Sequence, residues 1–349
     1  MSKVWIFLLA FAPGCSKHEP LAPPAAPLTP PTRLCGPNEG SPECRSASSI
    51  EQLLSADLEI LGMADTPSGM QGAKLLTLLS HDKDREIVLR AKWRPQSSED
   101  VINEPRKELA AYAVQHLFLD ETDLVVPPTT AHCFAGPHYR HFEPKARASL
   151  RGVDCVLGFL SYWLEDAKSV KSARKDGLLG PGSGVWDARR FQSDGAYRDS
   201  VSNGNLITYL INHGDAHDEQ FVLQTSPRGL RAFVVDNSIA FRSIKNPMLL
   251  LREDWSSIQV PALPSKAIAR LKALTPADFA RLGNISELAL QDGALVPISP
   301  SEPLASDGTT MTWNGSHLRI GLTTGEIELV AARTAELLKR PDLDALTRH

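Results

Sequence analysis

The sequence predicts an α+β fold in which an antiparallel sheet comes first and a mostly helical part follows. Three strand-like runs separated by turn-forming Gly, Asp and Ser lie one after another between residues 58 and 93. Most segments after residue 245 have helical spacing instead. A length of 349 residues with 42% hydrophobic residues allows one catalytic-sized domain with a sizeable core, plus a tail.

The charge balance excludes one class of partner. Lys and Arg together number 37 and Asp and Glu number 41, which gives a net charge of −4. Binding to a phosphate backbone usually needs an excess of basic residues. We therefore expect no nucleic-acid partner.

The first residues, 1–15, have the anatomy of a bacterial lipoprotein signal peptide. Lys3 precedes an apolar run at 4–12. This run is shorter than the about 20 residues that a membrane-spanning helix needs. Small residues then lead to Cys15 in the sequence Ala-Pro-Gly-Cys, which resembles a lipobox although Pro13 departs from the usual pattern. We expect an exported chain that a lipid on Cys15 anchors to a membrane of the bacterial cell envelope.

A Pro-rich tether is expected over residues 16–48. Eight of the 26 prolines lie within 20–44, with Ala, Thr and Ser between them. Such a composition does not pack a core and adopts extended, semi-rigid conformations. The segment would therefore connect the membrane to the folded domain.

Five cysteines leave an even number once Cys15 is set aside. Cys35 and Cys44 close a short loop rich in Gly, Pro and Ser, and an oxidising compartment favours a disulfide between them. Cys133 and Cys155 flank a turn region, where they either pair across neighbouring strands or stay buried as free thiols. The sequence leaves these two alternatives open.

The first part of the domain, up to residue 165, is expected to contain two helices and five strands. The helix at 104–118 has apolar residues at the spacing of one amphipathic face. The other segments are a helix at SIEQLLSA (49–56) and strands at LEILGMA (58–64), KLLTLL (74–79), EIVLRAKW (86–93), VVPPTTAHCF (125–134) and DCVLGFLSYW (154–163).

The second part begins with residues 166–200, which are polar and Gly-rich without a clear period, so we expect a loop or an insertion there. Residues 287–320 mix strand-like and turn-like signals that assign them to neither class. The predicted segments are a helix at 205–213, a hairpin of FVLQ (221–224) and LRAFVVD (230–236) around a turn at 226–229, and helices at 265–274, 275–282 and 325–340.

The densest polar cluster lies at 213–220, where five of eight residues are ionisable. Asp236 ends the second strand of the hairpin, so the hairpin would return its carboxylate to this cluster. The carboxylates of Asp215 and Asp236 and the amide oxygen of Gln220 would then converge. Such oxygens suit a hard cation such as Mg²⁺, which often binds together with substrate phosphates.

The order of these residues resembles the protein-kinase-like fold. Lys92 lies on the third strand and Glu108 on the following helix, and HGDAHDEQFVL (213–223) and FVVDNSIAF (233–241) come later. The likeness is to the atypical branches: the phosphatidylinositol 3/4-kinase-like and secretory-pathway kinases, and the aminoglycoside phosphotransferases. Their catalytic loops read D-x-H-x-x-N or H-G-D-x-H-x-x-N. The resemblance covers roughly residues 55–245.

The resemblance implies a two-lobed fold and an ATP-dependent activity. Residues 49–165 would form an antiparallel-sheet N-lobe, and residues 166–349 a mostly helical C-lobe with a polar insertion at 166–200. The activity would be phosphotransfer from ATP, with Mg²⁺ or Mn²⁺, to a hydroxyl of a protein or small molecule.

The resemblance also assigns roles to single residues. Lys92 would contact the α- and β-phosphates, and Glu108, rather than Glu104, would hold Lys92 by an ion pair. Asp215 would accept the proton of the attacking hydroxyl. Gln220 and Asp236 would hold the metal.

Two further segments would contact the nucleotide. Gly69 and Gly72 belong to a loop between the first two strands, where glycine lets backbone amides approach phosphates closely. Residues 159–164 fall where the family has the hinge that binds adenine through its backbone, which adds Tyr162 to the expected contacts.

One departure from the family leaves alternatives open. The family has Asn where this chain has Gln220, and a shift of about 1 Å in a metal-bound phosphate can cost roughly 100-fold in rate. A catalytically silent kinase-like binding module is therefore the main alternative. A third interpretation is a hydrolase in which His213, Asp215 and His217 ligate Zn²⁺ or Mn²⁺, because imidazole and carboxylate suit such ions.

Overall fold

The computed structural model describes residues 32–35, 44–67, 72–82, 85–96, 103–242, 254–301 and 310–347. The expected signal peptide with Cys15, most of the expected tether and Gly69 lie outside the described residues. Within the described part the chain is an α+β protein whose three larger sheets are antiparallel. No helix in that part combines the length and the apolar character needed to cross a membrane.

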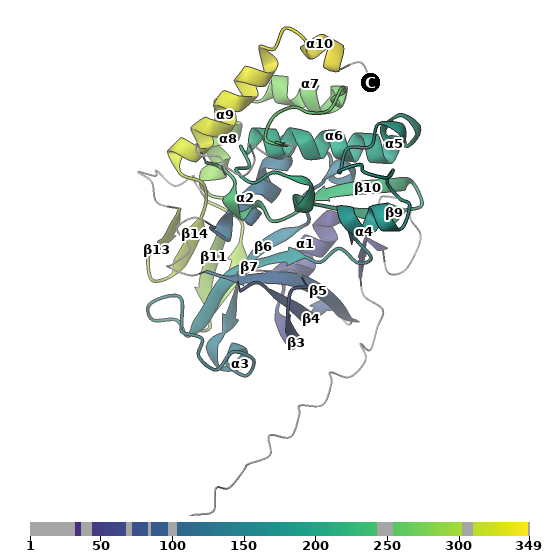
Figure 1. The fold of residues 1–349 in the computed structure, drawn as a ribbon. Coiled ribbons are helices and arrows are strands. Elements are labelled where there is room, and N and C mark those ends of the chain that lie inside the picture. Colours follow the sequence, from purple (N-terminus) through teal and green to yellow (C-terminus); the bar gives the residue numbers. More distant parts are fainter. Residues whose placement is uncertain are drawn as a thin grey trace, which may run out of the picture.

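The largest sheet has five strands in the order β3-β4-β5-β7-β6. It occupies the lower half of the view in Figure 1, below most of the helices. All five strands form where the sequence predicts them. Their bounds are β3 Leu58–Asp65, β4 Lys74–Asp82, β5 Arg85–Pro95, β6 Thr129–Ala135 and β7 Cys155–Tyr162.

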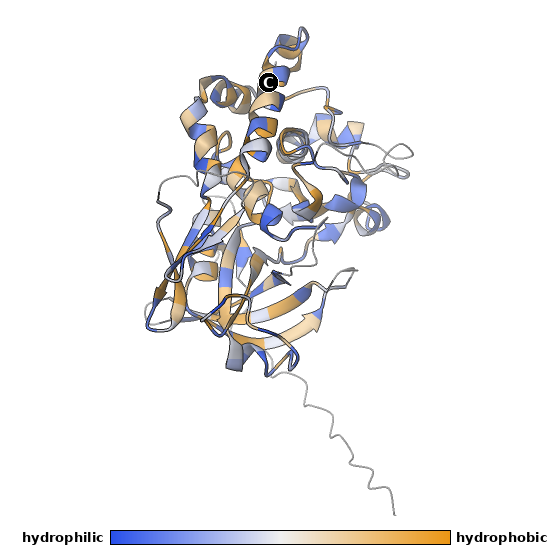
Figure 2. Ribbon diagram, turned by 90° about the vertical axis from the view of Figure 1, so that its left-hand side faces the viewer, coloured by the Kyte–Doolittle hydropathy of each residue, from blue (hydrophilic) through white to orange (hydrophobic). Residues whose placement is uncertain are grey.

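The alternation along β5 decides which face of this sheet Lys92 occupies. Ile87, Leu89, Ala91 and Trp93 are buried in one apolar core together with helix α1 (Ala47–Ser55). Figure 2 shows apolar residues concentrated along these strands. Successive side chains of a strand point to opposite faces, so Lys92 lies on the face away from this core.

Helix α2 (Arg106–Gln115) lies against that other face and differs from the expected amphipathic helix. Nine of its ten residues are buried, so it has no solvent-facing side to set against an apolar one. Its Leu109 packs among side chains of β6 and β7 and of a second sheet. The helix is therefore held between two sheets.

The second sheet occupies the segment that the sequence did not assign. Its four strands lie in the order β12-β11-β14-β13. They are β11 Ser286–Gln291, β12 Ala294–Ile298, β13 Met311–Trp313 and β14 His317–Ile320.

This sheet corrects the expectation of a mostly helical part over 166–349. Leu288, Leu318 and Ile320 face Leu157 and Phe159 of β7 in a shared apolar cluster, so the second sheet belongs with the first. Strands of three to six residues are too short to show a clear period in the sequence.

The segment 166–200 is also more ordered than expected. It contains α4 (Val170–Lys175), α5 (Ala188–Ser193) and the start of α6 (Gly195–Leu210). Asp194 caps α6 by accepting a hydrogen bond from the backbone N–H of Tyr197 at 3.1 Å. The start of α6 also buries polar side chains, such as Ser202, whose Oγ donates to the carbonyl of Ala262 at 2.8 Å, and these residues obscure the apolar period.

The predicted hairpin forms next to α6 and leads into the polar cluster. Its strands β9 (Phe221–Ser226) and β10 (Gly229–Val234) form a three-stranded sheet with β8 (Lys168–Ser169). The remaining described elements are β1 Arg33–Leu34, β2 Cys44–Arg45, η1 Glu121–Asp123, α3 Gly136–Tyr139, η2 Asp218–Gln220, η3 Asn237–Ile239, α7 Ser265–Ala273, α8 Pro276–Ala280, η5 Arg281–Gly283, α9 Thr324–Leu338 and α10 Leu343–Leu346.

Two disulfides join the cysteines left after Cys15. Cys35 pairs with Cys44 as expected, and Cys133 of β6 pairs with Cys155 of β7, so the free-thiol alternative for that pair is wrong. Disulfides persist in oxidising compartments. The pairing therefore agrees with an extracytoplasmic protein.

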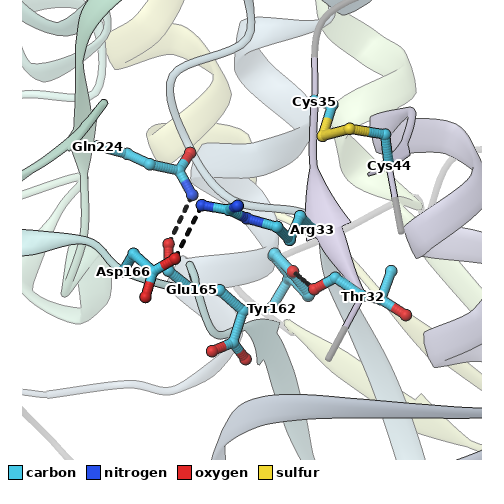
Figure 3. Close-up of a disulfide and its surroundings, with 8 residues drawn as sticks. All are labelled: Thr32, Arg33, Cys35, Cys44, Tyr162, Glu165, Asp166 and Gln224. Atoms are coloured by element: carbon cyan, nitrogen blue, oxygen red, sulfur yellow. Dashed lines mark hydrogen bonds and ion pairs between the residues drawn. A yellow bond between two sulfur atoms is a disulfide. The ribbon is translucent and has the colours of Figure 1, made fainter. Parts of the chain in front are cut away.

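The first disulfide fastens the N-terminal segment beside the end of β7 (Figure 3). Arg33 forms an ion pair with Asp166 at 2.8 Å. The hydroxyl of Tyr162 donates to the carbonyl of Thr32. The start of the described chain is thus bound to the connection between the large sheet and the helices.

Candidate active site

Three elements bring charged side chains together around Lys92. Its Nζ lies 2.9 Å from Oε1 of Glu108 on α2 and 3.0 Å from Oδ1 of Asp236 after β10. Burial opposes the charge on Lys92, but the two carboxylates outweigh it and raise the pKa of this ammonium. The ion pair expected from the sequence between Lys92 and Glu108 is present.

Glu108 joins β5 to the segment after β10. While Oε1 accepts from Lys92, Oε2 accepts from the backbone N–H of Asn237 at 2.9 Å. The alternative carboxylate, Glu104, pairs with Arg106 and Lys107 instead. A buried carboxylate with both oxygens hydrogen-bonded holds its partners in fixed positions.

Asp236 adopts a left-handed backbone conformation, with φ 60° and ψ 51°. Asp tolerates this region better than most residues, because its short side chain can bond locally. Its side chain is 47% exposed and Oδ1 also accepts from Ser238 at 3.4 Å. Desolvation opposes ionisation, yet the charge of Lys92 prevails and the pKa of Asp236 is lowered. The group is a carboxylate at neutral pH.

His213 is fully buried and connects the loop at 213–220 to Asp236. Its Nδ1 accepts from the backbone N–H of Asp215 at 3.2 Å, and its Nε2 lies 3.2 Å from the carbonyl oxygen of Asp236. Nε2 must therefore carry the proton, and the ring is neutral. Burial lowers the pKa of His213, which agrees with this assignment.

Asp215 and Gln220 lie beside each other in this loop. Nε2 of Gln220 donates to Oδ2 of Asp215 at 3.3 Å, and Nε2 of His217 lies 3.7 Å from the same oxygen. The backbone carbonyl of Gln220 accepts from Val235, next to Asp236. The loop and the metal-binding candidate Asp236 are thus joined through the backbone.

The remaining oxygens of the cluster are those that a hard cation would use. Within the described ranges, Oδ2 of Asp236 and Oε1 of Gln220 have no hydrogen-bond partner. Carboxylate and amide oxygens are ligands that Mg²⁺ accepts, usually together with substrate phosphate. Within those same ranges, no three His, Cys, Asp or Glu side chains gather as a metal-binding group.

Tyr162, an expected nucleotide contact, lies on the face of the sheet opposite to Lys92. The side chain of Tyr162 is buried in the core on the far face of the sheet, and its backbone N–H donates to the carbonyl of Pro128 at 2.8 Å. Neither its hydroxyl nor its N–H is free for adenine. Gly72 has φ 71° in the connection between β3 and β4 with open space around it, and Gly69 is outside the described residues.

The sequence reasoning missed a second cation beside the cluster. Arg94 lies two residues after Lys92 on the same face of β5 and is 5% exposed. Its guanidinium donates to Asn103 Oδ1 at 2.5 Å and to Ser238 Oγ at 3.1 Å. It therefore fixes the residues that follow Asp236. Arg94 follows Lys92 by two residues on the predicted strand, and this spacing is the sequence signal that places both side chains on the same face.

No family model matches the chain, and no curated protein matches it significantly in sequence. A lysine between two carboxylates, with a further carboxylate and amide nearby, can bind a phosphate-containing ligand with a cation and activate a hydroxyl.

The neutral state of His213 predicts how stability depends on pH. Its pKa is lowered in the fold, whereas an unfolded histidine titrates near about 6.5. Below that pH the unfolded chain binds a proton that the folded His213 does not, so this one group should lower the free energy of unfolding by up to about 1.4 kcal/mol per pH unit. Urea unfolding between about pH 5.5 and pH 7.5, roughly one unit either side of the unfolded pKa, measures this dependence.

The substitution His213→Asn should make this pH dependence shallower. His141→Asn, at an exposed position, serves as the matched control. An equal slope in the wild type and His213→Asn would show that His213 is not held neutral.

Proposed function

We propose that the protein is an ATP- and Mg²⁺-dependent phosphotransferase with a two-lobed protein-kinase-like fold. The observation that carries the proposal is Lys92 between Glu108 at 2.9 Å and Asp236 at 3.0 Å. Phosphoryl transfer in kinases depends on a strand lysine paired with a helix glutamate, next to a metal-binding aspartate. Here the three come from a sheet strand, the following helix and the end of a later hairpin, in that order.

The residues divide the work as follows. Lys92 binds the α- and β-phosphates, and Glu108 holds its ammonium in position. Asp215 accepts the proton of the acceptor hydroxyl and orients it. Asp236 and Gln220 hold the metal, which neutralises the phosphate charge when bound. Each group needs little movement, because catalysis of this type is mainly positioning and charge stabilisation.

The arrangement of elements supports the two-lobed part of the proposal. The five-stranded sheet with α2 would be the N-lobe, and the helices around α6 the C-lobe. The chain passes from one to the other after β7, where Glu165 pairs with Arg90 and Asp166 with Arg33. The second sheet is an addition that packs on the N-lobe.

A silent binding module remains a second candidate because of one contact. The side-chain amide of Gln220 donates a hydrogen bond to Asp215, the expected base, at 3.3 Å. A donor on that carboxylate stabilises its ionised form and competes with an incoming hydroxyl. The hydrolase interpretation has less support, because both ring nitrogens of His213 face backbone groups and neither offers a lone pair to a metal.

We further propose that the protein works outside the cytoplasm, anchored through a lipid on Cys15. The two disulfides support an oxidising compartment, and the short apolar run before Cys15 supports a lipoprotein signal. The acceptor would then be a hydroxyl of an extracytoplasmic protein or small molecule.

Substitutions at the three charged positions should differ in kind. Asp215→Asn should keep Mg-ATP affinity and lose at least about 100-fold in turnover, because it removes the base. Asp236→Ala should weaken Mg²⁺-dependent ATP binding, and Lys92→Met should weaken ATP binding with or without metal. Calorimetric titration with ATP, with and without Mg²⁺, measures binding, and a labelled-phosphate assay measures turnover.

Asp199→Asn provides the matched control, because this carboxylate is 62% exposed on α6. The proposal is contradicted if the wild type binds no nucleotide at millimolar ATP and neither Asp215→Asn nor Asp236→Ala changes the binding of any ligand.

Gln220→Asn tests whether the enzyme is active but poorly tuned. The shorter side chain places the amide oxygen where the kinase pattern has it and removes the donor from Asp215, so turnover should rise several-fold. Gln259→Asn at an exposed position is the control. Unchanged or lower turnover would show that the extra methylene does not limit the reaction.

Cys15→Ser tests the anchor. In a bacterial host the variant should move to the soluble fraction and lose labelling by a radioactive fatty acid. The variant Cys35→Ser/Cys44→Ser, which removes the disulfide between these two residues and leaves Cys15 intact, should stay with the membrane. A Cys15→Ser variant that fractionates like the wild type would show that Cys15 carries no lipid.

A further inference from the structure

Helix α2, which carries Glu108, is buried to an unusual degree for a helix with three charged residues in its first turn. Arg106, Lys107 and Glu108 are 4%, 2% and 5% exposed. Its N-cap is Pro105, which makes no side-chain capping bond. Buried charges are costly unless they are paired, so the partners of these residues determine where α2 can lie.

The strongest partner of α2 comes from the distant C-terminal helix. The guanidinium of Arg106 donates to both oxygens of Glu326 on α9, at 2.7 and 3.1 Å. The side chain of Glu326 is 12% exposed. A two-bond guanidinium–carboxylate pair fixes both position and angle. Nε of Arg106 also donates to Glu104 at 2.9 Å, just before α2.

Glu326 is itself held in place by the start of α9. Its Oε2 accepts from the backbone N–H of Thr323 at 2.9 Å, and the side chain of Thr323 accepts from the N–H of Glu326 at 3.2 Å. This capping box orients the carboxylate toward Arg106. One side chain therefore begins α9 and binds α2.

The chain enters α9 by a path that leaves little freedom. Gly321 lies between β14 and α9, and a Cβ there would come within 2.1 Å of the carbonyl oxygen of Gly283. Only glycine allows this approach. Leu322 then donates to Leu282 at 2.8 Å. The second sheet and α9 thus form one continuous support, and the sheet also packs on Leu109 of α2.

We propose that Arg106 and Glu326 are positioning residues through which the second sheet and α9 hold α2, and with it Glu108, against Lys92. The pair Lys92–Glu108 then forms without a separate activating partner or modification. The effect on turnover rests on the proposed phosphotransferase function, whereas the effect on α2 does not.

Hydrogen exchange of the full chain without nucleotide tests the position of α2 directly. Glu326→Gln keeps the capping box, which accepts Gln, but removes the charge that Arg106 binds. Exchange across α2 should accelerate by roughly tenfold, because a desolvated cation loses a partner. Arg106→Met should accelerate exchange in α2 to a similar extent. Arg106→Lys, which keeps the charge, should accelerate it less.

Arg340→Met is the control, because this arginine pairs with Asp342 at 2.7 Å near the end of α9, away from α2. It should leave α2 unchanged. Two outcomes in Glu326→Gln would overturn the proposal. Unchanged hydrogen exchange in α2 would show that Glu326 does not hold this helix in place. An equal acceleration of exchange in α6 would show only a general loss of stability. Should Arg106→Met not fold, Glu326→Gln and Arg106→Lys still decide.

Turnover gives the second measurement. In Glu326→Gln, kcat should fall by roughly tenfold with KM for the acceptor unchanged, because Lys92 loses its fixed partner while the acceptor site is untouched. Arg106→Lys, which keeps the positive charge, should retain a higher kcat than Arg106→Met. A wild type inactive with ATP would count against the proposed function alone, and the exchange result would still decide on Arg106 and Glu326.

Discussion

The ammonium of Lys92 is the group on which the arrangement around the site depends. Two carboxylates from different parts of the chain, Glu108 and Asp236, lie within 3.0 Å of it. Removing one partner of a buried ion pair typically costs about 3–5 kcal/mol, whereas an intact pair adds little net stability. These charges therefore fix the relative positions of β5, α2 and the segment after β10, and they add little to the free energy of unfolding. β5 must expose Lys92 on the face away from its core, α2 must lie across that face, and the hairpin must return Asp236.

The polar groups around Lys92 form a chain of fixed contacts. Glu108 bonds to Asn237, Arg94 to Ser238, and His213 to the backbone of both Asp215 and Asp236. These contacts give most of the buried polar groups a specific partner, which favours one structure, whereas Oδ1 of Asn237 has no partner among the described residues. The left-handed residue Asp236 is thus constrained from three directions. The proposed phosphotransfer would need such preorganisation, because it requires phosphate, metal and hydroxyl to be held in line.

The sequence predicted the parts of this structure that have a clear period. The strands β3 to β7, helix α2, the hairpin and the disulfide of Cys35 follow from alternation, turn residues and compartment. Placing Lys92, Glu108, Asp215 and Asp236 in kinase order located the cluster. The second sheet was not predicted because its strands are short. The start of α6 was not predicted because it buries the polar residues Ser200, Ser202 and Asn203 among its apolar ones. The contact of Arg106 with Glu326 joins residues 220 positions apart, and no local pattern carries such information.

A crystal structure of the protein with Mn²⁺ and a non-hydrolysable ATP analogue tests the central claim most directly. We expect an anomalous peak for Mn²⁺ beside the Asp236 carboxylate and the Gln220 amide oxygen. We also expect phosphate oxygens within hydrogen-bond distance of Lys92, with Glu108 still on its ammonium. Density for the analogue elsewhere, or Lys92 still bound only to Glu108 and Asp236 at saturating analogue and metal, would contradict the central claim.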